Sequence, residues 1–170
     1  SERLTSSYDW FFNPKVYFRA ADVEYIADEF LNLDYRIHYG IGLGYHIIDT
    51  SKVAWDVNAG PSYQTSKFLD VQDDASDTED SYGLTLGTDF TYEITGDIDY
   101  DATYSVQIID EEAGGNIHHF ETGLEIDLTN DFELDITFYA DRTENPKADS
   151  EGSLPEKNDF RLVIGFGYDF

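Results

Sequence analysis

The chain has 170 residues and a formal net charge of -26, with 10 Lys and Arg against 36 Asp and Glu. This balance argues against a nucleic-acid partner, because phosphate binding needs clustered basic side chains, and the absence of cysteine excludes a disulfide framework or a thiolate site. No window approaches the ~20 apolar residues of a membrane helix. The aromatic content of 16% instead suits the two aromatic girdles of a membrane β-barrel.

Alternation with period two runs along most of the chain and predicts strands. Residues 3–10 read as the end of a strand that leads into a turn at 11–14. Poor alternation around 20–22 predicts a β-bulge in the strand that follows. Complete strands are expected over 15–27, 33–47, 53–63, 82–94, 98–108, 117–128, 132–141 and 160–170.

The connections between these strands fall into two classes. Short turns are expected at 48–52, 95–97 and 128–131, and longer loops at 28–32, 67–81, 109–116 and 142–158. Short turns on one rim and long loops on the other are typical of an outer-membrane barrel with periplasmic turns and extracellular loops. The sequence therefore predicts an all-β, antiparallel up-and-down transmembrane β-barrel, with residues 1–170 as one domain of about eight strands. Because 3–10 suggest another strand, we expect ten or more strands in the full-length protein and an upstream part that this chain lacks.

The C-terminal segment 160–170 carries aromatic or aliphatic side chains at every second position and closes on Phe170. A fully apolar strand face that ends on an aromatic residue suits contact with lipid. Gly165, Tyr168 and Phe170 also resemble the C-terminal β-signal that bacterial insertion machinery recognises. We therefore expect a location in the bacterial outer membrane, with barrel-insertion machinery as a partner during assembly.

Two motifs carry a family resemblance. One is the strand Gly40-Ile-Gly-Leu-Gly-Tyr45 with the following Ile-Asp-Thr turn, and the other is Ala59-Gly-Pro-Ser-Tyr63 preceded by Trp55. With the terminal aromatic strand, they resemble the YdiY-like, salt-induced outer-membrane protein family, also known as domain of unknown function 481. The resemblance implies a barrel in the outer membrane. It supplies no established activity and no catalytic residues, and members of that family usually have sequence upstream of this point.

The polar face of the predicted strands should line the lumen. Its glycines 40, 42 and 44 alternate within a strand, so they form no phosphate loop and instead relieve crowding. Buried carboxylates need partners, so we expect a hydrogen-bonded plug, with a narrow cation-selective path as the alternative. Eight strands leave an interior that side chains just fill, which favours the plug. Asp34 is expected in the lumen, and the predicted polar network consists of Arg36, Asp56, Glu121, Glu125, Asp135 and Arg161.

An acidic loop and a pair of histidines are two further candidate sites. The acidic loop 70–80 offers carboxylates that Ca²⁺ could bind, but it lacks the glycine and spacing of an EF-hand, and repulsion between like charges favours a solvated loop. Its candidate ligands are Asp70, Asp73, Asp74, Asp77 and Asp80. His118 and His119 lie near the predicted outer rim beside the acids 110–112, where an enzyme acting on lipid or peptide would place them. No nucleophile has an evident partner there, so we expect no catalysis and no cofactor.

These observations predict a non-enzymatic outer-membrane barrel with a structural or envelope role in salt or osmotic adaptation. Its expected partners are membrane lipid and lipopolysaccharide, whose phosphates divalent ions could bridge to the acidic loop. The alternatives are a small cation-selective pore, a subunit of a larger outer-membrane or extracellular assembly, and a rim enzyme. A soluble ligand-binding barrel would place the same apolar residues inward.

Overall fold

The computed structural model describes residues 2–71, 76–129 and 131–168, except for the side chains of Phe30 and Glu112. It is all-β, as the alternation predicts, with two single-turn 3-10 segments, η1 (Glu29–Leu31) and η2 (Glu111–Ala113). No helix in these residues is long and apolar enough to cross a membrane. The strands are β1 (Glu2–Phe11), β2 (Val16–Asp28), β3 (Leu33–Asp49), β4 (Val53–Phe68), β5 (Thr78–Thr95), β6 (Ile98–Ile108), β7 (Asn116–Thr129), β8 (Phe132–Thr143) and β9 (Asn158–Tyr168).

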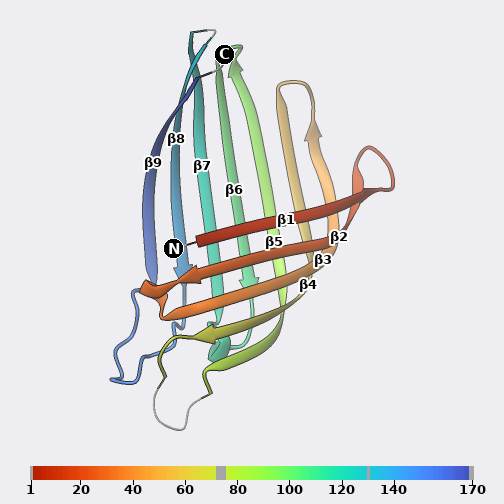
Figure 1. Cartoon of the computed structure of the whole chain (residues 1–170). Helices are drawn as coiled ribbons and strands as arrows, with labels where there is room; N and C mark the ends of the chain where they lie inside the picture. Colours follow the sequence, from red (N-terminus) through yellow and green to blue (C-terminus); the bar gives the residue numbers. More distant parts are fainter. Residues whose placement is uncertain (1, 72–75, 130, 169–170) are drawn as a thin grey trace.

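The nine strands form a single antiparallel meander in the order β1 to β9. The sheet curls strongly, so that β1–β4 cross in front of β5–β9 (Figure 1). Residues 2–11, expected as the end of a strand, form the complete strand β1. In the described residues β1 and β9 are the two edges of the sheet and are not paired with each other. Eight antiparallel pairings separate them, so they run in the same sense along the sheet.

The two classes of connection fall on opposite rims of the curved sheet, as predicted. Short turns follow β1, β3, β5 and β7, and we call their side the short-turn rim. Longer connections at 29–32, 69–77, 109–115 and 144–157 follow β2, β4, β6 and β8 and define the long-loop rim. Strand β9 ends at the short-turn rim. This asymmetry places the described strands in an up-and-down barrel wall.

The two faces of the sheet have opposite chemistry. Apolar side chains on the outer face are widely exposed, and on β9 they include Leu162 (64%), Ile164 (56%) and Phe166 (77%). The inner face holds the polar residues, among them His38 and Gln64, which are almost fully buried. A small apolar core lies at the long-loop rim and consists of Leu33, Phe68, Ala113 and Ile117. The fold therefore buries polar groups and exposes apolar ones, the reverse of a water-soluble barrel.

Two irregularities change which side chains face inward. The pairing of β2 with β3 slips between Arg19 and Asp22, which confirms the bulge predicted at 20–22. A second slip, at the start of β3, places Leu33 in the buried position. Asp34 is then exposed and pairs with Lys67 Nζ at 3.3 Å. The expectation that Asp34 lines the lumen is wrong, because one extra residue reverses the faces of a strand.

Gly44 on β3 leaves space for the ring of Tyr17 on the neighbouring strand. A Cβ atom built at Gly44 would overlap the ring atoms of Tyr17, which is itself buried. We expect Gly44→Ala to destabilise the folded barrel by about 1–3 kcal/mol, because the ring must move out of a packed position. Gly96→Ala is the matched control, since a Cβ at Gly96 meets nothing within 4 Å. Urea unfolding of both refolded variants measures the difference, and equal midpoints would show that the Tyr17 ring moves without cost.

Candidate functional site

The inner face of β5–β8 carries a row of carboxylates that crosses four adjacent strands. Glu93 is paired in register with Asp99, Asp99 with Glu125, and Glu125 with Asp135. We call these four residues the acidic row. Like charges directly opposite one another destabilise a sheet. The acidic row therefore lowers the stability of the fold, and folding alone does not explain its presence.

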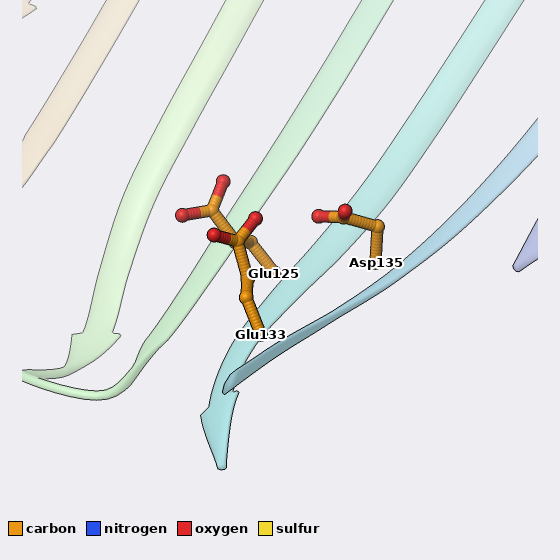
Figure 2. Close-up of side chains that lie close together, drawn as sticks. All are labelled: Glu125, Glu133 and Asp135. Atoms are coloured by element: carbon orange, nitrogen blue, oxygen red, sulfur yellow. The ribbon is translucent and has the colours of Figure 1, made fainter. Parts of the chain in front are cut away.

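The acidic row continues toward the short-turn rim through Glu133. One carboxylate oxygen from each of Glu125, Glu133 and Asp135 lies within 4.8 Å of the others, and Figure 2 shows the three side chains gathered on one side of β7 and β8. No Lys, Arg or His lies within 4 Å of these three in the described residues. The part of the lumen wall that β7 and β8 form near the short-turn rim is therefore strongly negative. Oxygen-only groups of this kind attract cations of the hard type, such as Ca²⁺ or Mg²⁺.

Three basic side chains, Arg3, His119 and Arg161, gather toward the long-loop rim of the lumen, where they join strands that do not pair. Arg3 on β1 lies 3.1 Å from Glu24 on β2 and 3.2 Å from Asp141 on β8. Asp141 also accepts a hydrogen bond from Arg161 Nη2 at 2.8 Å and lies 2.6 Å from His119 Nδ1, which in turn contacts Arg3. We call these five residues the cross-lumen network. It holds β1 against β7–β9 without backbone pairing.

Between the network and the acidic row lies a polar chamber of about 480 Å³. Its wall comes from β1–β4 on one side and β5–β7 on the other, which belong to the two parts of the sheet that cross in Figure 1. Two arginines contribute to the wall, and both are already paired: Arg3 as above and Arg19 through two hydrogen bonds to Asp9, at 2.9 and 3.0 Å. The lumen is thus open at the chamber and bridged by side chains at the cross-lumen network.

The remaining members of the predicted polar network occupy separate places on the inner face. Arg36 is buried near the long-loop rim and donates to Ser66 Oγ at 3.2 Å. Asp56 forms a close ion pair with His46 near the short-turn rim. Glu121 lies 3.7 Å from His119 Nε2, and Arg161 joins Asp141 to Asp159. The structure therefore groups Glu125 with Asp135 and Glu121 with Arg161, and leaves Arg36 and Asp56 apart from both.

The two histidines near the long-loop rim, His118 and His119, lie on opposite faces of the sheet. His118 lies on the outer face, where its Nδ1 is 2.8 Å from the Tyr104 hydroxyl and its Nε2 is 3.8 Å from Glu144. His119 faces the lumen within the cross-lumen network. Neither forms an ion pair with Asp110 or Glu111 in the described residues, and no serine or threonine hydroxyl contacts either ring. The arrangement places a tyrosine hydroxyl and a carboxylate beside the His118 ring.

The acidic loop after β4 lies only partly within the described residues, since Asp73 and Asp74 fall outside them. Asp70 accepts a hydrogen bond from Ser150 Oγ at 2.5 Å, and Asp80 accepts one from Thr65 Oγ1 at 2.8 Å. Asp77 accepts one from Thr78. These three bind different parts of the protein, so the Ca²⁺ site suggested by the loop stays a prediction. Of the assembly signal, Gly165 and Tyr168 lie in β9, and Phe170 falls outside the described residues.

Nothing in the sequence singles out Arg3 and Asp141, the two residues that organise the cross-lumen network. Arg3 lies in the predicted strand end 3–10, and Asp141 is the last residue of the predicted strand 132–141. Their separation of 138 positions gives no local signal. The acidic row could have been found, because the turn lengths fix the register of β5 with β6 and of β7 with β8.

Comparisons with known proteins agree with this geometry. No curated protein matches the chain. A solved structure of the NanC porin is similar, with a TM-score of 0.56 and 12% sequence identity over 99% of this chain and 78% of that one. At this identity the likeness shows a porin-like β-barrel fold and nothing further. The family model "Protein of unknown function, DUF481" matches residues 2–170, which confirms the resemblance found in the sequence, and the chain belongs to this family.

Proposed function

We propose that this chain forms an outer-membrane β-barrel whose acidic lumen conducts small cations. The observation that carries the proposal is the separation of the two faces. A continuous apolar outer face with exposed aromatic side chains suits lipid, and an inner face rich in carboxylates suits an aqueous path. The outer face includes Tyr39, Tyr45, Trp55, Tyr92 and Tyr168 as well as the aliphatic side chains of β9.

The location in the membrane is tested first. The refolded protein should run at different positions on a gel with and without boiling, and should keep its β-structure only in detergent or lipid. A protein that is folded and monodisperse in plain buffer, with no such shift, would overturn the outer-membrane proposal. Membrane lipid, lipopolysaccharide and the insertion machinery are the partners that this proposal implies. No role for nucleic acid is proposed.

The acidic row makes conduction testable by charge neutralisation. In planar bilayers the protein should pass K⁺ in preference to Cl⁻, because carboxylates that line a pore attract cations and repel anions. The double variant Glu125→Gln, Asp135→Asn should lower the permeability ratio severalfold. Asp97→Asn, in the exposed turn between β5 and β6, is the control and should leave the ratio unchanged. Equal ratios in all three proteins would show that the row does not set selectivity.

The cross-lumen network favours a second candidate, a closed barrel with a structural or envelope role in salt or osmotic adaptation. Charged side chains from five strands meet across the lumen and could obstruct it completely. A folded, heat-modifiable protein without conductance would support this role over conduction. In either case we propose that the protein is not an enzyme, because in the part of the chain that the structure describes neither His118 nor His119 contacts a serine or threonine hydroxyl. Lipid or peptide turnover that is lost in His118→Ala would contradict that.

A further inference from the structure

The polar chamber between β1–β4 and β5–β7 has a wall suited to a ligand larger than an inorganic ion. Its volume of about 480 Å³ lies within the range of sites that hold small molecules. None of the described residues that line it contributes an aliphatic side chain, and hydroxyl groups recur along the wall, as at Thr5, Ser7, Thr85 and Thr103. The chamber therefore suits a ligand that forms many hydrogen bonds.

The charges of the wall leave an excess of unpaired carboxylate. Both arginines are neutralised, Arg3 by Glu24 and Asp141 and Arg19 by Asp9. The carboxylate of Asp22 has no hydrogen bond or ion pair in the described part of the chain, although it is only partly exposed. Asp89 accepts a single hydrogen bond, from Thr103 Oγ1 at 3.0 Å. The charge that the chamber can still bind is therefore positive.

A buried amide gives an independent indication of the ligand. Gln107 lines the chamber and is 7% exposed, yet its Oε1 atom has no hydrogen-bond partner among the described residues. Its Nε2 atom donates to Glu24 at 3.4 Å. A buried acceptor without a donor is costly, so the site lacks a hydrogen-bond donor at this point. The wall beside the carboxylates is therefore short of hydrogen-bond donors, which suits a ligand rich in N–H and O–H groups.

A metal ion fits these groups poorly. A bound Ca²⁺ or Mg²⁺ needs several oxygen atoms that converge on one point. The carboxylates of Asp22, Asp89 and Glu121 do not form such a group, since the one converging acidic cluster in the described residues is Glu125, Glu133 and Asp135. The groups of the chamber are instead spread around a space of molecular size.

We propose that the chamber binds a small organic cation that carries a protonated amine and several hydroxyl groups, with an amino sugar as the simplest example. The amine would pair with Asp22 or Asp89, and the hydroxyl groups would face the polar wall around them. The chamber lies in the lumen that we propose as the conduction path, so this site rests on the proposed function. Binding itself does not depend on conduction, so the two can be tested apart.

The test compares glucosamine, which is protonated at neutral pH, with glucose, which has the same ring and no charge. Calorimetric titration of the refolded, heat-modifiable protein should show glucosamine binding at least about tenfold tighter than glucose, because a charge-assisted hydrogen bond replaces a neutral one. Asp22→Asn and Asp89→Asn should each weaken glucosamine binding, and Asp97→Asn should leave it unchanged. The comparison of the two sugars needs only the unaltered protein, so it holds even where a variant fails to fold.

Equal affinity for the two sugars, absent binding of glucosamine, or binding unaffected by both chamber variants would overturn this inference. Potassium conductance measured on the same protein without sugar distinguishes the two proposals. Conductance without glucosamine binding would refute the binding site and leave the conduction proposal standing. Glucosamine binding without conductance would refute the conduction proposal and leave the binding site standing.

Discussion

Replacing Ile164 by arginine is expected to prevent stable insertion of the barrel, whereas the same replacement at the adjacent Val163 is expected to be tolerated. Ile164 lies on the outer face in the middle of β9, opposite Ile136, and is 56% exposed. An arginine on the lipid face near the bilayer centre costs about 2–4 kcal/mol. Val163 faces the lumen opposite Thr137, where water and carboxylates accept a positive charge.

The experiment refolds both variants into lipid vesicles and measures the heat-modifiable fraction and the urea midpoint. Because the two positions are adjacent, the strand, its length and its propensity are matched, and only the face differs. Equal folding of the two variants would show that the apolar face does not contact lipid. Failure of Val163→Arg alone would reverse the assignment of the faces.

Asp141→Ala is expected to be the most damaging change within the lumen. This one carboxylate holds Arg3 at 3.2 Å and Arg161 at 2.8 Å, and it lies 2.6 Å from His119. Removing one partner of a buried ion pair costs about 3–5 kcal/mol, and because Asp141 is 19% exposed we expect a loss of about 2–3 kcal/mol. The loss should appear as a lower urea midpoint and as faster hydrogen exchange in β1, which the network holds in place.

Asp159→Ala is the control, because Asp159 forms only a more exposed pair with Arg161 at 3.2 Å. That change should alter stability by less than about 1 kcal/mol. Asp141→Asn keeps one acceptor oxygen and should lie between the two. If Asp141→Ala and Asp159→Ala had the same stability, the cross-lumen network would contribute little to holding β1.

The sequence by itself determined the strands, their order and the chemistry of their faces. Alternation with period two is a local property, so β3 and β4 were recognisable from residues 33–47 and 53–63 without knowing their neighbours, although both strands run further, to Asp49 and Phe68. The connections were equally local, and their two lengths predicted the two rims. Errors arose where one residue changed the phase, as at Asp34, because a bulge depends on pairing that a single strand does not reveal.

Only the tertiary structure decided how charges meet across the lumen. Arg3 and Asp141 lie 138 positions apart in the chain, and the curl of the whole sheet brings them together. The same curl encloses the chamber and leaves Asp22 and Gln107 facing a common space. Sheet curvature is the sum of small twists over many strand pairs. Which side chains face one another across the lumen is therefore a property of the complete sheet and not of any segment.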